Sequence, residues 1–241
     1  MNIALIGYGR MGKTIERIAL ERGHTIALII DQGEEMTPEN TKGVDVAIEF
    51  TVPSAVLKNL DFLAKHQIPT VCGTTGWLEN YQEVKAKFEK NGSFLYASNF
   101  SLGVNLFFQL NEILAKTMGR FPSYKTELEE IHHTLKLDAP SGTAITLAEG
   151  VIENTSYNAW ELSEDNMKYR TSGKENLPIQ AFRIPDVPGT HTVRYTSEVD
   201  DIEIKHTAHS REGFALGAVV AAEFIHDKKG IFQMKDVLGI Q

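Results

Sequence analysis

The first hundred residues alternate between short apolar runs and longer amphipathic segments. The apolar runs predict strands at 2–6, 25–30, 44–50, 69–72 and 94–97. Between them, apolar residues recur at helical spacing and predict helices after a glycine turn at 7–12, at 54–66 and at 79–90. Parallel strands joined by such helices require right-handed crossovers. We therefore expect a parallel sheet with helices on both faces.

The regular alternation stops after Asn99. Helical spacing then predicts helices at 104–117, 141–154 and 214–226. Strands are predicted at 125–131, 180–184, 190–197 and 202–208. Since the last three follow one another without helices, this sheet should be mixed or mostly antiparallel. The polar, aperiodic stretch 154–173 indicates a surface loop.

A glycine motif lies between the first predicted strand and the first helix. It has the form G-x-G-x-x-G and consists of Gly7, Tyr8, Gly9, Arg10, Met11 and Gly12. The first glycine permits a tight turn, the second lets a pyrophosphate approach the backbone, and the third lets the helix pack closely on the strand. The helix N-terminus also attracts phosphate charge. The motif predicts that these six residues bind a dinucleotide, and a glycine turn without a ligand is the alternative.

Asp31 ends the second strand about 20 residues beyond the glycines. A carboxylate at this position accepts hydrogen bonds from the adenosine ribose and repels a 2'-phosphate, which favours NADH over NADPH. Gln32 follows where an arginine would have helped to bind that phosphate. Arg10 and Lys13 could still reach a phosphate, so NADPH stays an alternative.

Two later turns lie at the carboxyl ends of predicted parallel strands, where open α/β sheets bind ligands. The residues of interest are Gly73, Thr74 and Thr75 in one turn, and Ala97, Ser98, Asn99 and Phe100 in the other. Small residues and hydroxyl groups suit the close passage of a nicotinamide ribose and carboxamide. We expect both turns to contact the cofactor, and ordinary turn chemistry is the alternative.

Together these patterns predict an α/β chain with two domains. The first is a Rossmann-like domain with a parallel sheet, formed by residues 1–103 and by residues 212–241, whose helix returns to pack on it. The second is an α+β domain of residues 104–211 with a mixed or antiparallel sheet, which we expect to bind substrate and to mediate oligomerisation.

The segment 127–144 combines proton-transfer groups with a turn that suits an anion. The groups are His132, His133 and Lys136, followed by Ser141, Gly142 and Thr143 at a predicted helix N-terminus. An imidazole beside an ammonium group has a lowered pKa, which suits it to proton transfer near neutral pH. The N–H groups and hydroxyl of the turn could bind a carboxylate.

A metal site is a competing interpretation of this segment. The candidate ligands are Glu129, Glu130, His132, His133, His206 and His209. Their spacing matches neither the HExxH motif nor a paired cysteine site, and Cys72 is the single cysteine. We therefore expect no metal cofactor. A purely structural role of the histidines is a further alternative.

Composition and charge narrow the range of partners. The 241 residues carry a formal net charge of -8, which disfavours a nucleic-acid partner. No apolar run approaches the roughly 20 residues of a membrane span, and the first residues lack the basic start and cleavage site of a signal peptide. The single cysteine fits a reducing compartment. We expect a cytoplasmic protein that acts on a small molecule.

The run H-H-x-x-K-x-D-x-P-S-G-T-A at 132–144 resembles the signature of the dihydrodipicolinate reductase family. Further blocks that resemble the family lie along the whole chain, at 7–12, 49–51, 73–76, 97–105, 183–189 and 206–222. The resemblance implies hydride transfer from NAD(P)H to a cyclic dicarboxylate, 4-hydroxy-tetrahydrodipicolinate. The products are tetrahydrodipicolinate and water, on the diaminopimelate route to lysine.

The resemblance also implies roles for single residues. His132 would be the acid/base residue and Lys136 the proton donor, while the substrate carboxylates would be bound by His133, Ser141, Gly142 and Thr143. The chemistry agrees, because a dianionic substrate needs cationic and N–H donors and hydride addition to a C=C–C=N system needs a nearby proton source. The family further implies a homotetramer built through the second-domain sheets, and closure of the two domains on substrate.

Three features depart from the family pattern. Only about 18 residues separate Asp31 from Glu49, so we expect a peripheral strand or helix to be missing there. Glu49 itself replaces an aspartate, and Phe224 stands where a tryptophan is frequent. Two other functions stay open: a catalytically silent NAD-binding regulatory protein of the same fold, and an aspartate-type Rossmann dehydrogenase. The complete proton-transfer set argues against a silent protein.

Overall fold

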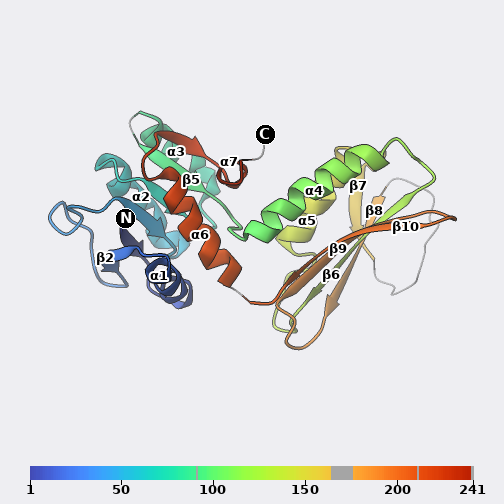
Figure 1. The fold of residues 1–241 in the computed structure, drawn as a ribbon, viewed down its shortest axis with the longest axis horizontal. Coiled ribbons are helices and arrows are strands. Elements are labelled where there is room, and N and C mark those ends of the chain that lie inside the picture. Colours follow the sequence, from blue (N-terminus) through green and yellow to red (C-terminus); the bar gives the residue numbers. More distant parts are fainter. Residues whose placement is uncertain (91, 164–175, 211, 240–241) are drawn as a thin grey trace. The chain divides into compact units, whose positions relative to one another are not determined.

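The computed structural model describes residues 1–90, 92–163, 176–210 and 212–239 (Figure 1). The chain divides into two compact units. One consists of Met1–Leu102 together with Glu212–Gln241, and the other of Gly103–Arg211. None of the helices in the described ranges is both long and apolar enough to cross a lipid bilayer.

The first unit is built on a six-stranded parallel sheet, as the alternating pattern predicts. In spatial order its strands are β11 (Gly230–Phe232), β5 (Ser93–Tyr96), β4 (Thr70–Cys72), β3 (Val46–Glu49), β1 (Asn2–Ile6) and β2 (Thr25–Ile30). The sequence did not predict β11, because three half-buried residues are too few to show a period. This strand pairs with β5 and so extends the sheet at one edge.

Helices cover both faces of this sheet. The helices are α1 (Arg10–Glu21), α2 (Pro53–Lys65), α3 (Tyr81–Glu89, after a 3₁₀ turn at Leu78–Asn80), α6 (Glu212–Ile225) and the short α7 (Met234–Val237). Successive residues of β1 enter different cores, since side chains alternate across a strand. Leu5 packs with α1 and α6, whereas Ile6 packs with α2 and α3.

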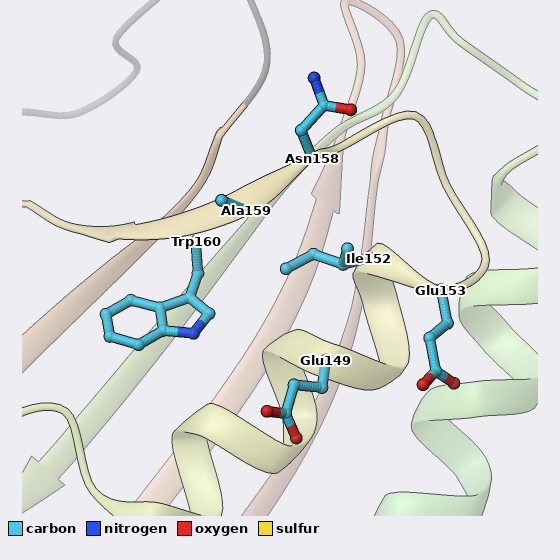
Figure 2. Close-up of a pocket in the computed structure, with 6 residues that line it drawn as sticks. All are labelled: Glu149, Ile152, Glu153, Asn158, Ala159 and Trp160. Atoms are coloured by element: carbon cyan, nitrogen blue, oxygen red, sulfur yellow. The ribbon is translucent and has the colours of Figure 1, made fainter.

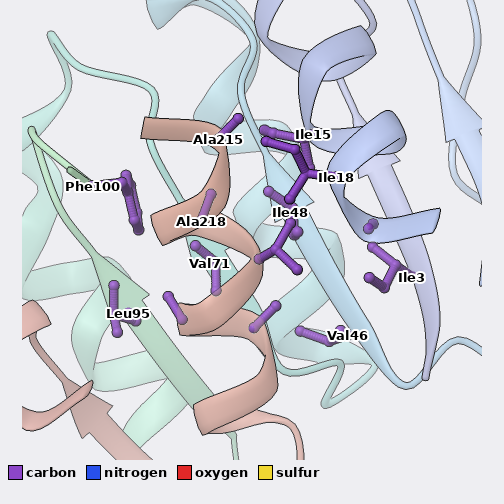
Figure 3. Packing of buried hydrophobic residues seen from close by; sticks show 14 of the residues in the cluster. Ile3, Ile15, Ile18, Val46, Ile48, Val71, Leu95, Phe100, Ala215 and Ala218 are labelled. Carbon is purple, nitrogen blue, oxygen red and sulfur yellow. The ribbon is translucent and has the colours of Figure 1, made fainter. Parts of the chain in front are cut away.

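The small side chains of α6 allow it to lie close to the sheet. Ala215 and Ala218 pack over the strands that carry Ile48 and Val71 (Figure 3). A Cβ at Gly217 would lie 1.7 Å from the main-chain oxygen of Phe100, so only glycine permits this approach. The predicted return of the C-terminal helix to the first sheet is confirmed.

The connection between β2 and β3 contains turns and neither a helix nor a strand. The expectation that a peripheral element is missing there is thus confirmed. As a result β2 is an edge strand of the sheet. The loop stays attached through Lys58 on α2, whose Nζ donates to Glu35 at 2.5 Å.

The second unit contains a five-stranded mixed sheet, in agreement with the prediction. In spatial order its strands are β10 (Asp201–Ala208), β9 (Gly189–Thr196), β6 (Lys125–His132), β8 (Asn176–Arg183) and β7 (Ala159–Leu162). β6 is antiparallel to β9 and parallel to β8. The predicted loop over 154–173 is wrong at β7, a mostly exposed edge strand whose four residues carry no alternating pattern. Residues 164–173 of that predicted loop lie outside the described ranges.

Two helices, α4 (Leu102–Met118) and α5 (Gly142–Ile152), pack on one face of this sheet. Leu128 of β6 and Val193 of β9 face them in the core. Ser141 is the N-cap of α5, and its Oγ accepts a hydrogen bond from the N–H of Ala144 at 3.2 Å. This cap brings the start of α5 to the end of β6, where the candidate histidines lie.

Candidate active site

The glycine turn has the geometry that a dinucleotide requires. Gly7 has φ 96°, and a Cβ there would lie 2.1 Å from the main-chain oxygen of Phe50. A Cβ at Gly12 would lie 2.3 Å from the oxygen of Gly7, so helix and turn are in close contact. By contrast, nothing lies within 4 Å of a Cβ built at Gly9. The middle glycine therefore leaves open space where a pyrophosphate would approach the helix N-terminus.

Asp31 lies next to this turn. The N–H of Gly7 donates to the oxygen of Ile30 at 2.8 Å, which joins the turn to the end of β2. An Oδ1 of Asp31 is then 3.5 Å from the backbone nitrogen of Tyr8. Glu34, which the sequence analysis did not single out, accepts a hydrogen bond from the N–H of Asp31 at 2.8 Å. Two exposed carboxylates thus flank the position expected for the adenosine ribose.

The side chain of Tyr8 is hydrogen-bonded within the protein, whereas that of Arg10 is exposed. Tyr8 donates its hydroxyl to Glu16, and this hydrogen bond raises the pKa of Tyr8. The Nζ of Lys13 lies 5.7 Å from the centre of the same ring. Arg10 and Met11 begin α1, with Arg10 exposed. Of these side chains, Arg10 and Lys13 are thus the exposed ones beside the glycine turn.

The turn after β4 is held rigidly from within. The buried Oγ1 of Thr74 accepts a hydrogen bond from the N–H of Thr51 at 2.7 Å. A Cβ at Gly73 would lie 2.2 Å from the ring of Phe50. Thr75 is exposed. Hence Thr74 shapes the turn, and Thr75 is the member whose side chain is free to meet a ligand.

The turn after β5 shows a similar division. Ala97 is anchored by its N–H, which donates to the oxygen of Cys72 at 3.2 Å, and Ser98 is exposed. Asn99 accepts a hydrogen bond from the N–H of Ser101 at 2.9 Å. The ring of Phe100 is buried, 5.5 Å from the ring of Phe50. Phe100 therefore contributes to the core, and a role beside the cofactor would fall to its backbone.

The second set of candidate residues belongs to the other unit and centres on Glu130 of β6. Its side chain is fully buried. Oε2 accepts the N–H of Ser141 at 3.0 Å, and Oε1 accepts Nη2 of Arg183 at 3.2 Å. Burial by itself would raise the pKa of Glu130, but contacts with His191 and Ser141 outweigh it and lower the pKa to about 2. Glu130 is thus a buried anion at neutral pH.

His132 lies at the edge of this cluster with 12% of its side chain exposed. Its Nε2 is 3.6 Å from Oε2 of Glu130 and 3.3 Å from Nε2 of His191. Its Nδ1 is 3.3 Å from the oxygen of Pro188, which can only accept, so Nδ1 carries the proton. Burial and His191 lower the pKa of His132 to about 4, so the ring is neutral at pH 7 with the Nε2 lone pair facing inward.

His191 also belongs to the cluster around Glu130, although no sequence pattern indicated it. It is buried on β9, directly opposite Glu130 in the strand pairing. Its Nε2 lies 3.7 Å from Oε2 of Glu130 and 3.1 Å from Oγ of Ser141. Nearby, a Cβ at Gly189 would lie 2.9 Å from Cε1 of His132, so a larger residue there would force that ring to shift. Only the register between β6 and β9 could have revealed both residues.

Arg183, at the end of β8, fastens the loop that carries Lys136. Its Nε donates to the oxygen of Lys136 at 3.2 Å, and its Nη2 donates to the oxygen of Asp138 at 2.5 Å. Lys136 in turn contacts the carboxylate of Asp138 at 2.8 Å, and this hydrogen bond lowers the pKa of Asp138. The loop that carries Lys136 is therefore linked to Glu130 through the guanidinium group of Arg183.

The predicted carboxylate-binding residues differ in whether their donor groups are already used in hydrogen bonds within the protein. His133 has a buried Nδ1 with no hydrogen-bond partner among the described residues. Gly142 is exposed, and nothing lies within 4 Å of a Cβ built there. Thr143 is half-buried beside it. Ser141, however, already uses its N–H and Oγ on Glu130, Ala144 and His191.

An open hollow lies at the other end of α5 (Figure 2). It is lined by Glu149, Ile152, Glu153, Asn158, Ala159 and Trp160. Since α5 begins at Gly142 and ends at Ile152, a helix of about 16 Å separates this hollow from the histidine cluster. Two carboxylates on its wall would repel a dianionic substrate. The hollow is therefore distinct from the candidate active site.

Comparison with known proteins gives a consistent picture. The family model described as dihydrodipicolinate reductase, N-terminus, matches residues 1–100, and the one described as dihydrodipicolinate reductase, C-terminus, matches residues 103–238. A 4-hydroxy-tetrahydrodipicolinate reductase of Christiangramia forsetii is 54% identical over 240 residues, which cover 99% of this chain and 98% of that protein.

More distant relatives agree. A 4-hydroxy-tetrahydrodipicolinate reductase of Psychrobacter arcticus is 36% identical and is covered over 95% of its length. Among solved structures, dihydrodipicolinate reductase from Paenisporosarcina sp. TG-14, with dipicolinate bound, matches with a TM-score of 0.78 at 22% identity. The alignment covers 97% of each chain, and it shows that the two share a fold.

Proposed function

The chain belongs to the dihydrodipicolinate reductase family, and from that premise we propose how its residues perform the reaction. The protein is an NAD(P)H-dependent oxidoreductase that converts 4-hydroxy-tetrahydrodipicolinate into tetrahydrodipicolinate and water, a step of lysine biosynthesis through diaminopimelate. The 54% identity over nearly the full length of a curated reductase carries this conclusion. It favours the reductase over both the silent regulatory protein and the aspartate-type dehydrogenase.

In the proposed mechanism Lys136 donates the proton. Hydride addition to the C=C–C=N system of the dehydrated ring leaves a carbanion-like centre, and one proton must be added to complete the reduction. The Nζ of Lys136 carries that proton and is partly exposed, with 21% of its side chain accessible. Asp138 holds the ammonium group in place before the transfer.

His132 acts in this proposal as the acid/base residue beside Lys136. Its neutral ring can accept a proton on Nε2, where the carboxylate of Glu130 faces it at 3.6 Å. That buried anion would stabilise the imidazolium while it lasts. His191 lies on the same side of that nitrogen as Glu130, with its Nε2 3.3 Å away, and can adjust its tautomer to the change.

The substrate carboxylates would be bound by His133, Gly142 and Thr143. Support comes from Nδ1 of His133, which has no partner among the described residues, and from the open start of α5, whose N–H groups would be donors to an anion. Ser141 contributes to the same turn mainly by capping α5 and orienting Glu130. A dianionic ligand thereby meets donors from two different elements.

For the cofactor we propose NADH as the preferred form, with NADPH as the alternative. When bound, the reduced nicotinamide supplies the hydride. Asp31 and Glu34 support the preference, because two carboxylates beside the ribose would repel a 2'-phosphate. The residues of the glycine motif would bind the pyrophosphate, and the turns at Thr75 and Ser98 would approach the nicotinamide end. No metal cofactor is needed for this chemistry.

We further propose a homotetramer formed through the uncovered face of the second sheet, in the cytoplasm. Within the described part of this unit, α4 and α5 lie on the Leu128 face. The other face carries Arg194, which pairs with Glu127 and Glu203 at 2.9 and 2.7 Å. The first unit would accordingly be the nucleotide-binding domain, and the second the substrate-binding and tetramerisation domain.

A coupled assay tests the proposed function. The aldolase product of aspartate semialdehyde and pyruvate is supplied, and nicotinamide oxidation is followed with NADH and NADPH separately. We expect oxidation that depends on the aldolase product, with a higher kcat/KM for NADH. Oxidation that does not depend on that product would contradict the substrate.

A further inference from the structure

We propose that Glu130, His132 and His191 form a binding site for one divalent transition-metal ion of the Zn²⁺ class, and that such an ion inhibits the enzyme by occupying His132. The three residues come from two neighbouring strands, β6 and β9. Their ligand atoms, Oε2 of Glu130 and Nε2 of each histidine, all lie within 4.8 Å of one another. This set differs from the six ligands suggested by the sequence, because it includes His191.

The separations among these atoms match those of a shared ion. Ligands about 2.0–2.1 Å from a tetrahedral zinc ion lie roughly 3.3–3.4 Å from each other. The two Nε2 atoms are 3.3 Å apart, and Oε2 of Glu130 is 3.6 Å from His132 and 3.7 Å from His191. An ion about 2.05 Å from both nitrogens would see them at an angle of roughly 107°, close to the tetrahedral value. With Oε2 of Glu130 at its present distances such an ion would lie almost in the plane of the three ligands, so the carboxylate has to approach by a few tenths of an ångström to complete a tetrahedral arrangement.

The orientation of the two rings also favours a common ligand over a simple hydrogen bond. The ring centroids of His132 and His191 are 5.0 Å apart, and the planes meet at 69°. Two rings that pointed end to end across a 3.3 Å gap would have more distant centroids. The rings are therefore bent away from an end-to-end arrangement, as two ligands of one ion would be, and Oε2 of Glu130 lies close to both nitrogens.

Hydrogen bonds from neighbouring groups orient the ligands, as is usual around metal sites in proteins. Metal-binding histidines typically donate their other ring nitrogen to a carbonyl or carboxylate. Nδ1 of His132 lies 3.3 Å from the oxygen of Pro188. Glu130 is oriented by the N–H of Ser141 and by Arg183, which occupies the other carboxylate oxygen. The ligands are thus positioned before an ion arrives.

Ser141 lies close enough to provide a fourth ligand. Oγ of Ser141 lies 3.1 Å from Nε2 of His191, so this hydroxyl, or a water molecule beside it, can complete a tetrahedron. An ion of this class suits a set of two imidazoles and one carboxylate. An ion would enter beside His132, which is the most exposed of the three ligands with 12% of its side chain accessible.

An ion held here would use the Nε2 lone pair of His132. The ring could then neither accept nor return a proton, so reductase activity would fall although the active-site residues are intact. The inhibition rests on the proposed role of His132, whereas the binding does not. The two are separated by measuring the binding in the absence of substrate.

Cobalt titration of the untagged, chelator-treated enzyme tests the site. Co²⁺ in a tetrahedral site absorbs strongly in the visible range, and we expect one equivalent per chain, displaced by Zn²⁺. His191→Gln should lower the affinity at least about 100-fold, beyond the 10–100-fold that loss of an outer hydrogen bond causes. The control His66→Gln, at an exposed position in the other unit, should bind as the wild type does.

The outcomes are distinct. A wild-type enzyme without a stoichiometric visible band, or a His191→Gln variant that binds Co²⁺ as tightly as the wild type, overturns the site. If circular dichroism shows that His191→Gln does not fold, His132→Gln at the partly exposed ligand provides the same comparison. Binding with unchanged NADH oxidation would overturn the inhibition while the metal site stands. Cobalt binding is measured without substrate, so it still tests the metal site if the reductase assay shows no activity.

Discussion

Arg183 donates a hydrogen bond to the main-chain oxygen of Lys136 at 3.2 Å, and so links the proton-donor loop to the end of β8. The same guanidinium reaches Glu130 at 3.2 Å. A lysine has one point of charge and no planar fork, and it could not make both contacts at once. Arg183 therefore positions Lys136 relative to the buried anion without touching the reacting atoms in our proposal.

We predict that Arg183→Lys lowers kcat about 10–100-fold, as loss of precise positioning does, while KM for the cofactor changes little. Steady-state kinetics with NADH as the varied substrate measures both. Arg120→Lys, at an exposed position of the same unit, should behave as the wild type. A wild-type kcat in Arg183→Lys would contradict the positioning role.

Lys136→Ala and His132→Ala should each lower turnover far more than they weaken NADH binding. Removal of a positioned acid or base typically costs about 10²–10⁴-fold in rate. The glycine motif belongs to the other unit, so the dissociation constant of NADH, measured by fluorescence titration, should stay close to that of the wild type. Lys116→Ala on the exposed side of α4 is the control. Unchanged turnover in both active-site variants would refute the assignment.

Asp31→Ala should weaken NADH more than NADPH. The carboxylate is expected to bind the ribose hydroxyls of NADH, an interaction of about 1–2 kcal/mol and hence roughly a 10-fold loss in affinity. Repulsion of the 2'-phosphate is lost in the same variant, and Glu34→Gln should show a smaller shift in the same direction. The ratio of kcat/KM for the two cofactors is the measurement. Equal losses for both cofactors would remove Asp31 from the ribose site.

Stability in acid should depend on Glu223 of α6. It accepts hydrogen bonds from Arg22 at 2.7 Å and contacts His24 at 2.7 Å, and these contacts lower the pKa of Glu223 from its usual 4.5. A carboxyl group whose pKa is lower in the folded than in the unfolded protein stabilises the fold at pH values above its unfolded pKa. This stabilisation disappears as the pH falls through the folded pKa. Glu223→Gln should therefore lower stability at pH 7 by roughly 1 kcal/mol.

That difference should shrink as the pH falls below about 4.5. Urea unfolding of the wild type and Glu223→Gln at several pH values gives the comparison. Glu112→Gln, an exposed residue of α4, controls for the removal of a negative charge. A difference that stays constant from pH 7 to pH 3 would show that the contacts of Glu223 do not depend on its charge.

The proposed oligomer is tested by light scattering. We expect a mass of four chains at micromolar concentration. Arg194→Glu would bring a third carboxylate between Glu127 and Glu203 on the uncovered sheet face, and it should shift the population to smaller species. Arg120→Glu serves as the control for charge. A wild-type chain that is monomeric would refute the tetramer.

Periodicity predicted the first unit well because its central strands are buried on both faces, the edge strand β2 is an unbroken apolar run after Thr25, and its helices have one apolar side. The strands at Asn2–Ile6 and Thr25–Ile30 were predicted to the residue. Where burial is slight the signal is lost, as in β7, where only Trp160 is half-buried. β11 is too short to show a pattern, and its partner β5 lies more than 130 residues earlier in the chain.

The candidate site was predicted as far as it is contiguous in sequence. His132, Lys136 and Ser141 lie within one segment, and the structure brings Ser141 and His132 to the same cluster. His191 and Arg183 enter through the strand pairing of β9 and β8 with β6, which no local pattern encodes. The burial of Phe100 and Thr74 likewise depends on neighbours from other strands.

The return of α6 and β11 to the first sheet has a consequence for synthesis on the ribosome. Residues 103–211 have a core of their own and can fold as soon as they emerge. The N-terminal residues emerge earlier, yet one face of their sheet is covered only by α1 until Ala218 and Val219 of α6 have been translated. The nascent protein therefore exposes an unfinished apolar surface during most of elongation, and its first-made unit is the last to mature.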